Sequence, residues 1–587
     1  MGSPSTATSA PASAKPKLHG RAFYESLGSP KFVVAPMVDQ SEFAWRRLTR
    51  SFLTPQENTK LLAYTPMFHA RLFEETPKYR DTHFQATKHP VGTPECDPTS
   101  LFLDGNPKLD RPLFVQFCAN DPEHLLHAAE MVAPYCDAVD LNLGCPQGIA
   151  RKGHYGAFLQ EDQDLIYRLI NILHKNLSIP VTAKIRILET KEDTLAYAKN
   201  VLAAGASILT VHGRRREQKG HLTGVADWDY IRYLRENLPK DTVIFANGNI
   251  LQHGDVEKCL EATGADAIMS AEGNLSDPSI FGAPPPVGQE GREYWRDRDG
   301  KGGYRVDAIF RRYMDILHRH ALDQEPPERR PLFVVGDDES WLNDTAARNG
   351  DDHEEGPARK KVKRDNASKQ RSTSPNIVAV RPHLFHLLRH FISRHTDIRD
   401  TLARTNPGDI NGVEKVLDMV ERRVAQGLID YEKTDGKSIE EEEAITSKPK
   451  AQATTTEPAK GDSNSKEQQD IDDPEYDPES SVATVKACKR PWWIAQPIVR
   501  PLPKEALAKG SIKMSKKEKK KQEQAAAAAA VASTPATPAG VESVNGNGHT
   551  QKLEDELPET DEKDGGIKEP SIDPAAPELM DDKLVSG

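Results

Sequence analysis

One cysteine, Cys145, stands in the stretch with the clearest chemical potential. It follows an apolar run at 138–141 and is bracketed by Asn142 and Pro146. A strand that ends here would deliver the thiol to the edge of a sheet, where it can act as an acid or a nucleophile. The alternative is an inert buried side chain, as free cysteines often are. A glycine-rich segment at 148–156 favours chemistry, since it could form a mobile loop over a bound substrate.

Polar side chains recur at the ends of other apolar runs. They are Gln116 and Cys118, Lys184 and Arg186, His212 and Arg214, and Asn247 and Asn249. Lys184 is the most informative, because burying an ammonium without an anion is costly. Its anionic partner is either a bound ligand or a structural ion pair. Two glycine-bearing turns, at 247–249 and 271–273, come after the last two runs, where backbone amides hold phosphate in barrel enzymes. They indicate a phosphorylated cofactor.

The elements that would position these residues are short apolar runs, most without polar alternation, as expected of parallel strands covered on both faces. The eight runs are 32–36, 61–65, 113–117, 138–141, 181–187, 208–211, 243–246 and 267–270. Amphipathic helices fit between them, and Asp121 and Asp227 are expected to cap two of these helices. Eight β/α units in about 250 residues predict an α/β fold, the TIM (β/α)8 barrel. The alternative, a doubly wound sheet, lacks its Gly-x-Gly-x-x-Gly fingerprint after the first run.

The composition excludes several classes of protein. The chain has 587 residues, of which 37% are hydrophobic, and a mean hydropathy of −0.64, so much of it builds no core. Its six cysteines are scattered without paired spacing, which argues against a disulfide scaffold and against a metal site. No apolar run approaches the length of a membrane span. The net charge of −11 decides nothing about nucleic acid, because acidic and basic residues are segregated along the chain.

The alternation of polar and apolar stretches predicts the domain boundaries. Segments 304–320, 382–399 and 413–428 carry apolar residues at helical spacing, so we expect a small all-α domain after the barrel. Polar stretches around them cannot bury enough surface to fold. The predicted boundaries are a disordered leader at 1–28, the barrel at 29–290, the helical domain at 300–321 and 377–433, a disordered insert at 322–376, and a mostly disordered tail at 434–587 with a docking segment at 486–503.

Five motifs together resemble the tRNA-dihydrouridine synthase family, in order and in spacing, over residues 32–281. They are Ala35-Pro36-Met37, Asn142-Leu143-Gly144-Cys145-Pro146, Ala183-Lys184-Ile185-Arg186, His212-Gly213-Arg214 and Ala246-Asn247-Gly248-Asn249-Ile250. Residues 217–220 and 269–275 look like the eukaryotic subfamily that acts on uridines 16 and 17 of the tRNA D loop. Where the bacterial pattern has Gly-Arg after the eighth strand, this chain has Ala271-Glu272-Gly273. Phosphate binding there would rest on backbone amides.

The resemblance implies an enzyme that binds FMN, takes electrons from NADPH and reduces uridine to 5,6-dihydrouridine. Cys145 would protonate C5 after a hydride reaches C6, and Lys184 and His212 would stabilise the anionic edge of the reduced flavin. The implied cofactor ligands are Ala35, Pro36, Met37, Gln116, Lys184, His212, Asn247, Gly248, Asn249, Ala271, Glu272 and Gly273. The implied substrate ligands are Asn142, Arg186, Arg214, Arg389 and Arg394. No metal is expected.

The implied partner is tRNA, from which the target uridine must be turned out of its stack. Arginines of the helical domain are candidates for phosphate contacts, and a solvated helix face is the alternative for each. These are Arg311, Arg312, Arg381, Arg389, Arg394 and Arg399. The helical domain argues against a second interpretation, a dihydroorotate dehydrogenase-like barrel that acts on a free pyrimidine. A third is a noncatalytic RNA-binding protein.

Two basic tracts, at 359–364 and 516–521, are typical of nuclear localisation signals or of nonspecific RNA contacts. We therefore expect a protein of the nucleus and the cytoplasm rather than of mitochondria. We also expect a monomer that does not associate with membranes.

Overall fold

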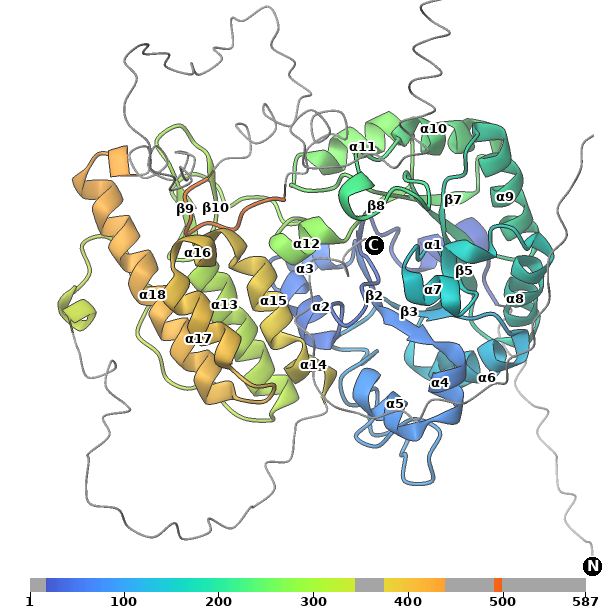
Figure 1. The fold of residues 1–587 in the computed structure, drawn as a ribbon, viewed down its shortest axis with the longest axis horizontal. Helices are drawn as coiled ribbons and strands as arrows, with labels where there is room; N and C mark the ends of the chain where they lie inside the picture. Colours follow the sequence, from blue (N-terminus) through green and yellow to red (C-terminus); the bar gives the residue numbers. More distant parts are fainter. Residues whose placement is uncertain (1–16, 344–373, 439–489, 499–587) are drawn as a thin grey trace, which may run out of the picture. The chain divides into compact units, whose positions relative to one another are not determined.

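The computed structural model describes residues 17–343, 374–438 and 490–498. Within them, eight parallel strands form a closed barrel in which each strand pairs with its neighbours in sequence and β8 pairs with β1 (Figure 1). This confirms the predicted TIM barrel. The strands are β1 (Phe32–Val34), β2 (Leu61–His69), β3 (Leu113–Cys118), β4 (Ala138–Leu143), β5 (Val181–Arg186), β6 (Ile208–His212), β7 (Val243–Asn247) and β8 (Ala267–Ser270).

Helices surround the strands of the barrel (Figure 1). The two predicted caps are confirmed: the Asp121 carboxylate accepts from the amides of Glu123 and His124, and Asp227 accepts from the amide of Asp229. The helices are α1 (Gly20–Ser26), α2 (Phe43–Arg50), α3 (Pro55–Asn58), α4 (Ala70–Glu75), α5 (Pro77–His83), α6 (Pro122–Val132), α7 (Gly148–Lys152), α8 (Gln163–Asn176), α9 (Lys191–Ala203), α10 (Trp228–Asn237), α11 (Asp255–Thr263) and α12 (Glu272–Ser276). Short 3-10 turns lie at Ala133–Tyr135, Gly156–Leu159 and Gly220–Leu222.

The strand register places polar side chains in layers toward the carboxyl ends of the strands. Alternate residues of a strand face the same side, so residues two apart on one strand belong to successive layers. From the inside outward the layers of register partners are Gln116, Asp140 and Thr182; then Asn142, Lys184 and Thr210; then Arg186, His212 and Asn247. The carboxyl end of this barrel is therefore a polar mouth built from β3 to β7.

A group of helices follows the barrel in sequence. The elements are β9 (Tyr294–Arg296), β10 (Gly302–Tyr304), α13 (Val306–Ile316) with a π turn at Leu317–Ala321, a 3-10 turn at Ser340–Asn343, α14 (Pro375–Val378), α15 (Val380–Leu387), α16 (Arg389–Arg394), α17 (Thr396–Arg404) and α18 (Ile410–Lys433). The prediction of one helix at 382–399 is wrong, because His395, with φ −97° and ψ 79°, leaves the helical region and separates α16 from α17. The predicted helix at 413–428 is confirmed and extends further at both ends as α18.

Buried polar contacts join α2 to α13, α14 and α15. The imidazole of His383 stacks on the indole of Trp45, with ring centroids 3.9 Å apart and planes 3° apart. His383 Nε2 also lies 2.9 Å from Glu42 Oε2, and the hydroxyl of Tyr313 donates to Glu42 Oε1. The amide of Asn376 accepts a hydrogen bond from the backbone of α2. Both buried rings and hydrogen bonds thus fix α2 against these helices.

Parts of the predicted insert and of the predicted docking segment lie among the described residues. Leu332 and Phe333 are buried, and the carbonyl of Phe333 accepts from Arg305 at 2.6 Å. Residues 490–498 run beside the start of α13, where Val306 N donates to the carbonyl of Trp493. Residues 17–28 of the predicted leader are also described and contain α1, in which Phe23 and Tyr24 are buried. Residues 1–16, 344–373, 439–489 and 499–587 lie outside the described residues. In the described ranges, none of the helices has the length and apolarity needed to span a membrane.

Candidate active site

Cys145 lies directly after β4 at the polar mouth, in a turn that Asn142 holds. Asn142 Oδ1 accepts hydrogen bonds from the backbone amides of Gly144 at 3.1 Å and Cys145 at 2.8 Å. Gly156 packs against this turn with φ +66°, and a Cβ there would lie 2.8 Å from the carbonyl oxygen of Cys145. No other residue fits at that position. The segment in which the sequence suggests a mobile loop contains α7 and a 3-10 turn.

The surroundings of Cys145 keep its thiol protonated. Burial raises the pKa of the thiol above its ordinary value and outweighs the opposing effects of a backbone hydrogen bond and of Arg186, Lys184 and Lys219. At neutral pH the group is therefore an acid with a proton to give. The same cations lie near enough to stabilise the thiolate that remains after proton transfer.

Lys184 is buried in β5, with 4% of its surface exposed, and none of the described residues forms an ion pair with it. Burial, followed by the repulsion of Arg186, lowers the pKa of the ammonium to about 7. The structural ion pair that the sequence left open is thus not found in the described part of the chain. An anionic ligand would supply the missing partner.

His212 and Asn247 present unpartnered buried atoms to the mouth. Arg214 donates to His212 Nε2 at 3.1 Å, and a guanidinium can only donate, so the proton of a neutral imidazole lies on Nδ1. Burial, followed by the nearby cations Arg186, Lys184 and Arg214, lowers the pKa of His212 well below its usual value and keeps the ring neutral. In the described part of the chain, neither His212 Nδ1 nor Asn247 Oδ1 has a hydrogen-bond partner. The mouth therefore offers one buried donor and one buried acceptor.

The turns after β7 and β8 bring backbone close to these side chains. Gly248 has φ +110°, and a Cβ there would lie 2.6 Å from Ala226 and 3.1 Å from the ring of His212. Asn249 Oδ1 accepts from Arg214 Nη2 and from the amide of Ala226, so its side chain braces the loop. A Cβ at Gly273 would lie 2.2 Å from the carbonyl oxygen of Ile250. Close backbone approach thus requires glycine in both turns.

Several predicted ligands lie at the rim of the mouth. Ala35 and Met37 are buried after β1, where Ala35 N donates to the carbonyl of Ser270 and Met37 N donates to Ser41 Oγ. Pro36 lies between them, and Ala271 and Glu272 lie at the start of α12 after β8. The barrel therefore brings the predicted residues of β1, β3 to β6 and the last two turns to one end.

Two predicted substrate ligands also hold the loops together. Arg186 Nε donates to the carbonyl of Gly144 at 2.7 Å, and its Nη1 donates to the carbonyl of Arg215. Arg214 donates to the carbonyl of Gly224, to Asn249 and to His212. Substrate binding by Arg186 and Arg214 stays a prediction, whereas their contribution to loop geometry is direct.

Asp140, a buried acid that is not among the residues predicted from the sequence, lies beneath the mouth. Its Oδ1 accepts from Thr182 Oγ1 at 2.6 Å, and its Oδ2 accepts from Gln116 Nε2 at 2.8 Å. Gln116 Oε1 in turn accepts from Asn142 Nδ2 at 2.8 Å. The available signal was a charged residue inside the apolar run 138–141, which is as unusual as Lys184 in its own strand.

The predicted RNA-contacting arginines lie outside the barrel. Arg389 is exposed and Arg394 is half-buried on α16, where its guanidinium lies 5.5 Å from the centre of the Trp492 ring. Four further arginines named for this role contact other residues of the protein. Arg311 pairs with Glu421, Arg312 with Glu293, Arg399 with Asp400, and Arg381 donates to the carbonyl of Thr405.

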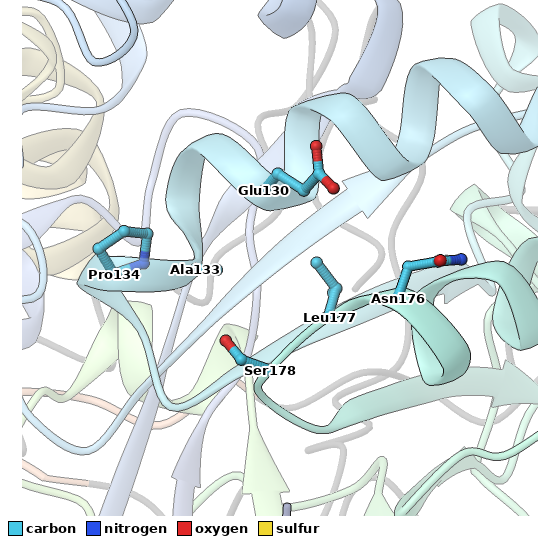
Figure 2. Close-up of a pocket in the computed structure, with 6 residues that line it drawn as sticks. All are labelled: Glu130, Ala133, Pro134, Asn176, Leu177 and Ser178. Atoms are coloured by element: carbon cyan, nitrogen blue, oxygen red, sulfur yellow. The ribbon is translucent and has the colours of Figure 1, made fainter. Parts of the chain in front are cut away.

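A surface pocket lies at the opposite end of the strands, beside the residues that lead into β4 and β5 (Figure 2). Its lining residues are Glu130, Ala133, Pro134, Asn176, Leu177 and Ser178. One carboxylate and no cation line it, so its chemistry does not suit an anionic ligand. Within residues 17–343, 374–438 and 490–498, no group of His, Cys, Asp and Glu side chains is arranged to hold a metal ion.

Comparison with known proteins gives a consistent result. The family model described as dihydrouridine synthase (Dus) matches residues 33–293, a range that contains all of the barrel strands except the first residue of β1. A Saccharomyces cerevisiae protein named tRNA-dihydrouridine(16/17) synthase, whose name includes NAD(P)(+), is 47% identical over 390 residues, or 66% of this chain and 73% of the yeast protein. The Schizosaccharomyces pombe protein of the same name is 41% identical over 429 residues, or 73% of this chain and 87% of the relative.

A relative with a different positional name is less similar. The human tRNA-dihydrouridine(20a/20b) synthase-like protein is 32% identical over 252 residues, which cover 42% of this chain and 70% of the human protein. The two yeast relatives therefore match along a longer stretch and at higher identity.

Proposed function

Because the chain belongs to the tRNA-dihydrouridine synthase family, we propose that it reduces uridines 16 and 17 in the D loop of tRNA to 5,6-dihydrouridine. Membership makes it an oxidoreductase. The choice of positions 16 and 17 is supported by the names of the two yeast relatives, which match 66% and 73% of this chain, against 42% for the relative named for 20a/20b. The observation that carries the chemistry is a protonated thiol, Cys145, in the same mouth as an unpaired buried lysine.

The polar mouth fits FMN. The Lys184 ammonium, the His212 Nδ1 hydrogen and the Asn247 Oδ1 acceptor await partners, and a flavin mononucleotide carries both anionic and polar edges. Gln116 and the stretch 35–37 would hold the ring, and the turns at 247–249 and 271–273 would hold the phosphate through backbone amides. Bound FMN, with electrons from NADPH, supplies the hydride for C6 of the uracil.

Cys145 completes the reduction by giving its proton to C5. Burial keeps the thiol protonated until it is needed, and Arg186, Lys184 and Lys219 favour the thiolate that is left. Asn142 holds the Cys145 turn by two backbone hydrogen bonds and would orient the uracil beside it. Solvent then returns the proton to the thiolate for the next turnover.

The helical part would bind the tRNA from which the uridine is extruded. Arg389 and Arg394 on α16 are the proposed phosphate contacts. We propose that the protein works as a monomer in the nucleus and the cytoplasm. The two basic tracts that support the nuclear location, 359–364 and 516–521, lie outside the described residues.

Cys145→Ala tests the proposed chemistry. Reduction of the bound flavin by NADPH is expected to stay at the wild-type rate, whereas reduction of uridine in unmodified tRNA should slow by about 10²- to 10⁴-fold, because the general acid is lost. Single-turnover kinetics and mass spectrometry of the tRNA measure both steps and the modified positions. Cys96→Ala, a thiol in the loop between α5 and β3, is the matched control. Wild-type uridine reduction by Cys145→Ala would remove the thiol from the mechanism, and product at other uridines would refute positions 16 and 17.

A further inference from the structure

A chain of four hydrogen-bonded side chains runs beneath the Cys145 turn across β5, β4 and β3. Thr182 and Gln116 both donate to Asp140, Asn142 donates to Gln116, and the backbone of Cys145 donates to Asn142. Asp140 and Gln116 are fully buried, as is Thr182. The links between side chains are all 2.6 to 2.8 Å long. Asp140 is the charged member of these four hydrogen-bonded side chains.

The two ends of the chain fix the orientation of both amides between them. Backbone N–H groups can only donate, so Asn142 must turn its oxygen toward Gly144 and Cys145 and its nitrogen toward Gln116. Gln116 must then accept with its oxygen and direct its nitrogen to an acceptor. An ionised carboxylate only accepts, and Asp140 fills that place. Reversal of either amide would set two acceptors or two donors against each other.

We propose that Asp140 is a positioning residue, which fixes the amide orientations of Gln116 and Asn142 and thereby the placement of the Cys145 thiol. The proposal rests on the proposed function and assigns a role to a residue that touches neither the thiol nor the substrate. A buried carboxylate is costly to keep, which argues against a merely space-filling role. Burial raises its pKa to about 6, so most molecules carry the acceptor form at pH 7.

The proposed orientation has a consequence for ligand chemistry. Each amide nitrogen has two hydrogens, and the chain uses one from each. Among the described residues, no acceptor takes the second hydrogens of Gln116 and Asn142, which remain as donors for the carbonyl oxygens of a pyrimidine. Without Asp140, the amide of Gln116 could reverse and present its oxygen instead.

A double-mutant cycle between positions 140 and 116 tests the proposal in the full, flavin-loaded chain. Asp140→Asn places at position 140 an amide that can meet Gln116 with its nitrogen as well as with its oxygen, so the orientation of Gln116 is no longer fixed. We expect uridine reduction in a single turnover to slow at least twofold, while NADPH reduces the flavin at nearly the wild-type rate. Gln116→Glu alone sets two carboxylates together and should also impair the reaction. In the double variant, the amide at position 140 can donate to the carboxylate at position 116, which still accepts from Asn142. Adding Asp140→Asn to Gln116→Glu should therefore improve the reaction. A merely structural role for Asp140 predicts that the two losses add.

Alkylation of Cys145 by iodoacetamide, followed by mass spectrometry, gives a second readout that needs no tRNA. Asp140→Asn should change the alkylation rate at least threefold, and the double variant should return it toward the wild-type rate. Thr182→Ser keeps the hydroxyl donor to Asp140 and is the matched control. If Asp140→Asn alone does not fold, the proposal is still tested by comparing uridine reduction by Gln116→Glu with uridine reduction by the double variant. Additive losses, or wild-type rates in Asp140→Asn, would overturn the proposal; a wild-type protein that leaves uridine unchanged would instead refute the proposed function.

Discussion

The polar mouth and the cluster formed by Arg46, Asp104 and Asp110 both bury cations, but they neutralise them differently. The guanidinium of Arg46 is fully buried and lies 2.6 Å from Asp104 and 2.5 Å from Asp110. Lys184 is 4% exposed, and none of the described residues forms an ion pair with it. The described residues supply two paired carboxylates to Arg46 and none to Lys184, so an anionic ligand would complete the site around Lys184.

The pKa values of Arg46 and Lys184 are shifted in opposite directions. Burial alone would lower the pKa of Arg46, but Asp110 and Asp104 outweigh it and raise that pKa above its ordinary value. For Lys184 the order is reversed, because burial and Arg186 outweigh the attraction of Asp140 and lower the pKa to about 7. Arg46 therefore stays charged at physiological pH, while the charge of Lys184 depends on pH and on what is bound.

Removal of the cation should have its largest effect in the Arg46 cluster. Arg46→Met leaves Asp104 and Asp110 buried without their cation, although each still accepts from a backbone amide. Breaking such a pair costs about 3–5 kcal/mol of the free energy of unfolding. Urea denaturation of the full chain, followed by circular dichroism, measures the loss. Arg399→Met is the control, because Arg399 and Asp400 form an exposed pair whose removal should leave the midpoint unchanged. Equal midpoints for the two variants would contradict the structural role of the Arg46 cluster.

The same type of substitution at Lys184 should act on the ligand rather than on the fold. Lys184→Met removes an unpaired, desolvated ammonium, so the thermal midpoint of the flavin-free protein should stay the same or rise. FMN affinity should fall about 10- to 100-fold, since a hydrogen bond to a charged group contributes about 1.5–3 kcal/mol. Fluorescence titration with FMN measures the affinity, and Lys175→Met on the exposed surface of α8 is the control. A midpoint that drops as far as that of Arg46→Met would make Lys184 a structural residue and remove the contrast.

The contrast also shows how far the sequence alone leads. The strands were predictable because each is an apolar run, and Cys145, Lys184 and His212 were predictable as neighbours because parallel strands end on one side of a barrel. Whether Lys184 was paired could not be read from the sequence, because a partner can come from any of the other strands. The contacts of Asp140 to Gln116 and Thr182 depend on the register of three neighbouring strands. Arg186 and Arg214 donate to backbone carbonyls. Contacts to backbone leave no mark in the residue types.

The smallest expected effect is a pH dependence that is confined to the mouth. Since the pKa of Lys184 is about 7 in the free protein, raising the pH from 7 to 9 removes the charge that an anionic ligand requires, and FMN binding must then take up a proton. FMN affinity should therefore fall with rising pH, by at most tenfold per pH unit. His212 does not titrate in this window, because burial lowers its pKa well below the ordinary value, and burial raises the pKa of the Cys145 thiol above its ordinary value.

Fluorescence titrations of FMN at intervals between pH 7 and 9 measure this slope, and calorimetry in two buffers of different ionisation enthalpy counts the protons taken up. In Lys184→Met both the slope and the proton uptake should vanish, while in Arg399→Met they should match the wild type. A slope that persists without Lys184 would show that another group of the mouth titrates, and that group would then be the one that contacts FMN. A flat wild-type profile would mean that Lys184 is already charged in the free protein. Lys184 would then need an anionic partner within the chain, as Arg46 has, and the contrast between the two cations would be lost.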